Sequence, residues 1–99
     1  MPNDREPTLT KQTMLVLSIL MGSAAPVAGS VIAAESRLAS GSLYPILIRL
    51  EKAGWIKSEW EDGEAGAKPR RRLYSMTALG VRRARQEARE WRRVTESFA

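Results

Sequence analysis

Residues 40–56 read SGSLYPILIRLEKAGWI and residues 70–76 read RRRLYSM, and these two stretches decide the fold. In the first, leucines recur at helical spacing from Leu43 onward and Gly54 supplies a stop, so we expect a helix over residues 40–54. In the second, large and polar side chains alternate as they do in a half-buried strand. A helix followed at once by a two-stranded hairpin with a basic tip is the layout of a winged helix.

The start of this helix sets which residues it exposes. We expect it to begin close to Gly41 or Ser42, with Ser40 or Ser42 as cap, because hydroxyls accept the free N–H groups of a first turn. Pro45 then falls in the first turn, where its missing N–H costs little. The free face carries hydroxyls, a phenol and cations, which suit phosphates and base edges, and it also carries Ile48. The candidate DNA-contacting residues on this helix are Ser40, Ser42, Tyr44, Pro45, Arg49 and Lys52.

Positive charge gathers in the last third of the chain. Residues 1–67 carry 6 basic and 8 acidic side chains, whereas residues 68–99 carry 10 basic and 3 acidic ones. The hairpin tip holds four cations within five residues: Lys68, Arg70, Arg71 and Arg72. We expect these four to grip phosphates or the minor groove, because they lie beside a glycine-bearing loop. A solvated basic loop without a partner is the alternative.

Composition excludes several classes of protein. The chain has 99 residues, enough for one domain with a modest core, and contains neither cysteine nor histidine. A disulfide framework is therefore excluded, and we expect a cytoplasmic protein. The commonest general base and metal ligand are missing, so we expect no enzyme, no metal and no cofactor. The longest apolar stretch, Met14 to Met21, is far short of the about 20 residues that span a bilayer, so we expect no membrane segment.

Other helices are expected on both sides of the opening stretch. Thr8 or Thr10 can cap a first helix running to about Met21, and Pro26 can begin a second, short helix. A final helix opens at the cap Thr77 and continues to the terminus. The chain is thus mainly α with a small β-hairpin: residues 1–7 form a flexible arm, residues 8–76 a winged helix-turn-helix and residues 77–99 a C-terminal dimerisation helix.

The final helix carries a narrow apolar stripe at steps of three and four residues, like that of a coiled coil. A small chain has little core left for this helix to cover, so its aromatic residues would stay in water unless a second copy covered them. We therefore expect a homodimer. The candidate dimer or ligand residues are Met14, Leu17, Ala84, Ala88, Trp91, Val94 and Phe98. Trp55 and Trp60 are expected to serve the packing of the hairpin.

Together these stretches resemble the PadR family of transcriptional regulators over about residues 8–98. The matching pieces are LYP at residues 43–45, RLEKAG at 49–54, RRLYSMT at 71–77 with Gly80 after it, and EW at 90–91. The single C-terminal helix is similar to the short subgroup, and this implies a dimeric repressor that pairs through its first and last helices. The resemblance also implies a small aromatic or cationic effector at Trp91, whereas interface packing alone is the other interpretation.

These observations predict a homodimer that places two copies of helix 40–54 in successive major grooves of double-stranded DNA. Two-fold symmetry then predicts a pseudo-palindromic operator with half-sites about one helical turn apart. Repression is what the family resemblance implies. The alternative is a winged-helix adaptor or antirepressor that docks on another protein without binding DNA.

Overall fold

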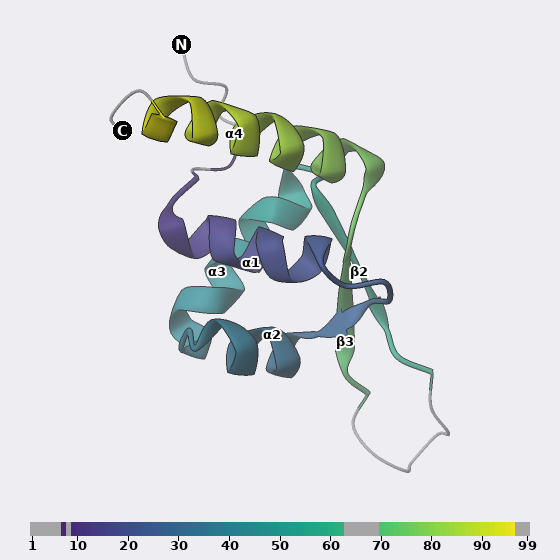
Figure 1. Ribbon diagram of the computed structural model, residues 1–99. Coiled ribbons are helices and arrows are strands. Elements are labelled where there is room, and N and C mark those ends of the chain that lie inside the picture. The colour runs from purple at the N-terminus through teal and green to yellow at the C-terminus, as the bar shows by residue number, and fades with distance from the viewer. Residues whose placement is uncertain (1–6, 8, 63–69, 97–99) are drawn as a thin grey trace.

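The computed structural model describes residue 7 and residues 9–62 and 70–96, and within them it has four helices and a three-stranded sheet (Figure 1). The fold is a winged helix-turn-helix followed by a long C-terminal helix, so the predicted fold class is confirmed. The elements are α1 Lys11–Met21, β1 Val27–Ala28, α2 Gly29–Ser36, α3 Ser40–Lys52, β2 Ile56–Trp60, β3 Arg72–Met76 and α4 Ala78–Glu96.

The segment after α1 differs from the sequence prediction. Pro26 does not open a helix; instead Val27 and Ala28 form β1, which pairs antiparallel with β3, and α2 begins at Gly29. The strand order is β1-β3-β2. The physical reason is that β3 would otherwise leave a row of unpaired backbone groups on its second edge. A β-branched valine after a proline with fixed φ suits this extended pairing.

The start of α3 also corrects the prediction. Its N-cap is Ala39, whose backbone is extended and whose side chain makes no capping hydrogen bond, so neither Ser40 nor Ser42 is the cap. Pro45 is consequently inside the helix rather than in its first turn, and it cannot donate a hydrogen bond to the carbonyl of Gly41. Packing offsets this loss, because four apolar residues of α3 are buried: Leu43, Ile46, Leu47 and Leu50.

The end of α3 joins it directly to the hairpin. Gly54 has a φ of +80°, its N–H donates to the carbonyl of Glu51 at 3.0 Å, and the N–H of Trp55 donates to Leu50 at 3.0 Å. These two bonds form a Schellman motif, which satisfies the last carbonyls of a helix and reverses the chain. The predicted stop at Gly54 is correct. β2 therefore starts two residues after the reversal.

A single core lies between α1, α2, α3 and one face of the sheet. Its buried members include Val16 of α1, Ile32 of α2, Leu43 of α3 and Tyr74 of β3. Trp55 is also buried in this core, but Trp60 is 57% exposed. The prediction that both tryptophans pack within the hairpin thus fails for Trp55, which belongs to the common core.

α4 begins where the hairpin ends and then leaves the core. The Thr77 side chain accepts a hydrogen bond from the N–H of Gly80 at 3.0 Å, so the predicted cap is correct. Gly80 is the one buried residue in the described part of α4. The rest of the helix lies across the end of the molecule opposite to α2 and is largely exposed (Figure 1). None of the helices in the described ranges is long and apolar enough to cross a membrane.

Candidate nucleic-acid interface

The outward face of α3 carries the first group of candidate residues. All six predicted contacts on this helix are exposed: Ser40, Ser42, Tyr44, Pro45, Arg49 and Lys52. The helix can expose them because its four buried apolar residues lie on the opposite side. Arg49 and Lys52 lie in its last turn, where the helix dipole favours cations. α3 therefore presents hydroxyl donors and two cations on one accessible surface.

Tyr44 has a second role in addition to its place on this surface. The residue is 43% exposed, but its hydroxyl is close to the start of α2: a Cβ built on Gly29 would lie 3.1 Å from that oxygen. A side chain at position 29 would press on the Tyr44 hydroxyl, so glycine lets α2 and α3 pack closely here. Tyr74 packs at the same point, 3.5 Å from such a Cβ. Burial raises the pKa of the Tyr74 phenol above its ordinary value of 10.0, so this ring stays neutral at physiological pH.

Arg71 is held beside the hairpin tip by a carboxylate. Its backbone N–H donates to Glu61 Oε1 at 3.1 Å and its Nε donates to Glu61 Oε2 at 3.1 Å. The backbone bond is the main reason that the pKa of Glu61 is lowered from its ordinary 4.5, and the guanidinium adds to it. The Glu61 side chain is thus ionised and is held in place by its two bonds to Arg71. A phosphate that binds Arg71 must compete with this carboxylate.

Arg72 connects the hairpin to the C-terminal end of α3. Its Nε donates to Ser58 Oγ at 3.0 Å, and one terminal nitrogen lies 3.7 Å from Glu51 Oε2. Ser58 in turn donates to Glu51 at 2.8 Å. The Arg72 guanidinium also lies over the Trp60 ring, 5.2 Å from its centroid, which is cation–π geometry. Arg72 therefore links the hairpin to α3 and is also a surface cation.

The other two basic residues of the predicted tip are Lys68 and Arg70. Lys68 lies outside the described residues. Arg70 is exposed and is engaged with another part of the molecule. Sequence reasoning placed all these cations at the tip, but it missed the partners that hold two of them: Glu51, Ser58 and Glu61. These partners follow from the strand register, in which Trp60 is paired with Arg72 and the Glu61 N–H donates to the Arg71 carbonyl.

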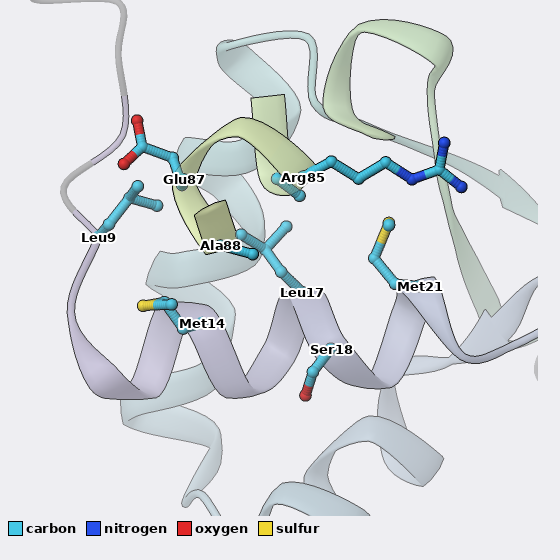
Figure 2. Close-up of a pocket in the computed structure, with 9 residues that line it drawn as sticks. Leu9, Met14, Leu17, Ser18, Met21, Arg85, Glu87 and Ala88 are labelled. Atoms are coloured by element: carbon cyan, nitrogen blue, oxygen red, sulfur yellow. The ribbon is translucent and has the colours of Figure 1, made fainter. Parts of the chain in front are cut away.

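A second candidate surface lies between α1 and α4. Leu9, Met14, Leu17 and Met21 face Ala84 and Ala88 across an apolar groove of about 260 Å³. Figure 2 shows Leu17 of α1 pointing towards Ala88 of α4, with Met14 and Met21 on its two sides. The structure thus brings together four of the seven predicted dimer residues: Met14, Leu17, Ala84 and Ala88.

The groove continues along α4 into a shallower depression that carries two more of these candidates. Trp91 and Val94 line it together with Met14, and they are 55% and 52% exposed. Two carboxylates, Glu87 and Glu90, line the same depression. Phe98 lies outside the described residues. Within the described ranges, no group of three or more histidine, cysteine, aspartate or glutamate side chains could hold a metal ion.

Several proteins of known structure that resemble this chain are transcriptional regulators. The profile of the transcriptional regulator PadR-like family matches residues 28–86. A PadR family regulator from Clostridium difficile R20291 is 28% identical with a TM-score of 0.75, covering 89% of this chain and 94% of that one. One from Eggerthella lenta is 29% identical with a TM-score of 0.70, covering 86% and 78%. A PadR-like transcription factor from Bacteroides fragilis is 25% identical with a TM-score of 0.72, covering 87% and 84%.

A search among proteins of curated function gave no match. The winged helix, the long terminal helix and the neighbours in structure define a small transcriptional regulator. Because the family profile covers more than half of its residues, this chain belongs to the PadR-like family. The family and the structural neighbours are regulators of transcription rather than enzymes.

Proposed function

We propose that the protein is a sequence-specific regulator that binds double-stranded DNA as a homodimer and represses transcription in the cytoplasm. The observation that carries this proposal is the exposed face of α3, where hydroxyls and cations lie beside an arginine-bearing hairpin. A helix of this width fits the major groove, and the hairpin can reach the adjacent backbone. The domain boundaries follow from this division: residues 8–76 bind DNA and residues 77–99 pair.

The distribution of charge gives α3 and the hairpin different roles in DNA binding. α3 carries Arg49 and Lys52 against Glu51, so it supplies little net charge and most of the affinity must come from elsewhere. We assign this role to the hairpin arginines and to doubling across a dimer. When DNA arrives, Arg71 and Arg72 exchange a carboxylate partner for a phosphate. Each exchange stabilises the DNA complex less than a phosphate contact by an unpaired cation would, because the ion pair within the protein is lost.

The dimer proposal depends on the apolar surface of α1 and α4. The groove lined by Leu17 and Ala88 is open to solvent along a helix that also exposes Trp91. The α4 of a second copy is the natural occupant, because its own stripe of Ala84, Ala88 and Trp91 shares the apolar character of the groove. Two-fold symmetry would then place the two α3 helices about one DNA turn apart.

A selection of bound duplexes from a random pool tests DNA binding, symmetry and half-site spacing at once. Salt titration then tests the hairpin. Arg70→Ala with Arg71→Ala should weaken binding to all sequences and reduce the salt slope by nearly two units, at about 0.9 per lost phosphate contact. The matched control is Arg82→Ala with Arg89→Ala, which removes the same charge from α4 and should leave the slope unchanged. Equal slopes in the two double variants would remove the hairpin from the interface.

Sedimentation equilibrium tests the dimer. Ala88→Glu places a carboxylate in the apolar groove and should convert the dimer to monomers at micromolar concentration. Gln86→Glu adds the same charge on an exposed position of the same helix and serves as the control. A protein that is dimeric in both variants would contradict pairing through this groove. A protein without salt-sensitive affinity for random duplex DNA would instead favour the adaptor function.

The Trp91 depression suggests the chemistry of an effector. An exposed indole offers a stacking and cation–π surface, and the carboxylates of Glu87 and Glu90 line the same depression, with Glu90 also 3.8 Å from Arg93. We therefore propose that a flat aromatic cation binds between the paired Trp91 side chains and lowers DNA affinity. Proflavine should quench the tryptophan fluorescence of the wild type but not that of Trp91→Ala. Anthracene-2-carboxylate, which is flat but anionic, should bind much more weakly; equal binding would contradict the role of the two carboxylates.

A further inference from the structure

The outermost ridge of α3 is apolar at its centre. Leu43, Leu47 and Leu50 define the buried side of the helix. Because successive residues are about 100° apart around the helix axis, the residues that point directly away from this side form a single row. From the N-terminal end this row contains Gly41, Pro45, Ile48 and Lys52. The hydroxyls and Arg49 thus flank the ridge, while a helix that enters a groove would present the ridge itself deepest.

The first three members of this row cannot make side-chain hydrogen bonds. Gly41 has no side chain, and a Cβ there would meet nothing within 4 Å, so the space beside its Cα is open. Pro45 lacks an N–H as well as a polar side chain. Ile48 is 52% exposed, the largest exposed fraction of any large aliphatic side chain on α3. A single exposed isoleucine is ordinary on a protein surface, but this one lies at the apex of the element that would face bases.

The major groove offers one apolar partner for such a ridge. Thymine carries a C5-methyl group there, whereas the other groups on the base edges are hydrogen-bond donors and acceptors. An isoleucine pressed against guanine or cytosine would leave those groups without water or a partner. Pro45 and Ile48 are one turn apart, so both can touch methyl groups within one half-site.

We propose that Ile48, supported by Pro45, reads thymine methyl groups at the centre of each half-site. This inference rests on the proposed function, and it narrows that function to operators with a thymine at this position. Ser42 and Arg49 on the flank of the ridge then contact neighbouring bases or phosphates. Discrimination comes from apolar contact at the centre of the helix and from hydrogen bonds at its sides.

Thymine-to-uracil substitution tests the inference, because it removes the methyl group and nothing else. In an operator selected from a random pool, each half-site should contain one thymine whose replacement by deoxyuridine weakens binding about four-fold, the value expected for burial of one methyl group. Replacement in both half-sites should cost about sixteen-fold. Ile48→Ala should bind the two DNAs equally well, while Ile48→Val should keep most of the preference.

Leu15→Ala provides the control, because it truncates an exposed apolar residue of α1 at 41% exposure and should retain the full preference for thymine. Thermal melting of each variant shows whether it is folded. The inference is overturned if an operator is selected but no thymine methyl matters, or if Ile48→Ala keeps the same uracil penalty. If no sequence is enriched and random duplex DNA is not bound, the proposed function itself fails, which is a separate result.

Discussion

Gly80→Ala should destabilise the protein although alanine is the better helix former. In the structure the first turn of α4 lies directly against the backbone of Trp55. A Cβ built on Gly80 would lie 2.7 Å from the carbonyl carbon of Trp55 and 2.9 Å from its Cα, and it would overlap the carbonyl oxygen. Real Cβ atoms do not approach backbone this closely, so α4 or residue 55 must move.

The movement has a cost that can be estimated from the hydrogen bonds at this point. The Trp55 carbonyl accepts the Thr77 N–H at 3.0 Å, the Thr77 hydroxyl donates to the Gly54 carbonyl at 2.6 Å, and Gly80 donates to Thr77 Oγ1 at 3.0 Å. Losing these bonds costs about 1 kcal/mol each. Alanine returns at most about 1 kcal/mol through helix propensity. The free energy of unfolding should therefore fall by about 2 kcal/mol.

Urea unfolding followed by circular dichroism at one fixed protein concentration measures this difference. Gly41→Ala is the matched control, because it is the same substitution in a helix at a position where the new Cβ meets nothing within 4 Å. It should raise stability by about 0.5 to 1 kcal/mol. A Gly80→Ala protein as stable as the wild type would refute the argument from close packing.

Two further predictions concern the core and the hairpin. Leu43→Ala, at a side chain that is fully buried, should lower the free energy of unfolding by about 2 to 5 kcal/mol in the same urea assay, and Ile48→Ala on the exposed side should leave it within about 0.5 kcal/mol. The Glu61 pKa is lowered on folding, chiefly by the backbone N–H of Arg71. The Glu61 carboxylate therefore stabilises the fold above pH 4.5, and this stabilisation is lost as the pH falls through the lowered pKa. Glu61→Gln should thus be less stable than the wild type at pH 7, with the difference vanishing at strongly acidic pH; a difference that does not depend on pH would contradict the ion pair.

The elements with strong internal patterns could be predicted from the sequence, and those set by tertiary pairing could not. The Leu43 to Leu50 spacing and Gly54 predicted α3 and its end. The first residue of α3 was missed because the cap, Ala39, has no side-chain signal and is fixed by its backbone. β1 was missed because it has only two residues, and a free edge on β3 is what makes it a strand.

The candidate surfaces show the same division. Exposure of the α3 candidates followed from helical periodicity alone. The partners of Arg71 and Arg72 depend on strand register and on where α3 ends, which are properties of the folded chain. The register pairs Trp60 with Arg72 and Ser58 with Tyr74, so Ser58, Trp60 and Arg72 share one face of the hairpin. Alternation within a single strand does not give this shared face, and Glu51 comes from a different element.

The Trp55 peptide joins three elements, and this has a mechanical consequence. Its N–H closes α3, its carbonyl receives Thr77, and Gly80 rests against it. One peptide therefore connects α3, the base of the hairpin and the first turn of α4. In the proposed dimer, an effector that separates the two α4 helices would change the distance and the tilt between the two α3 helices. The internal structure of each α3 helix would stay the same. DNA would be released because the spacing of the two α3 helices no longer matches the pitch of the duplex, although both helices remain folded.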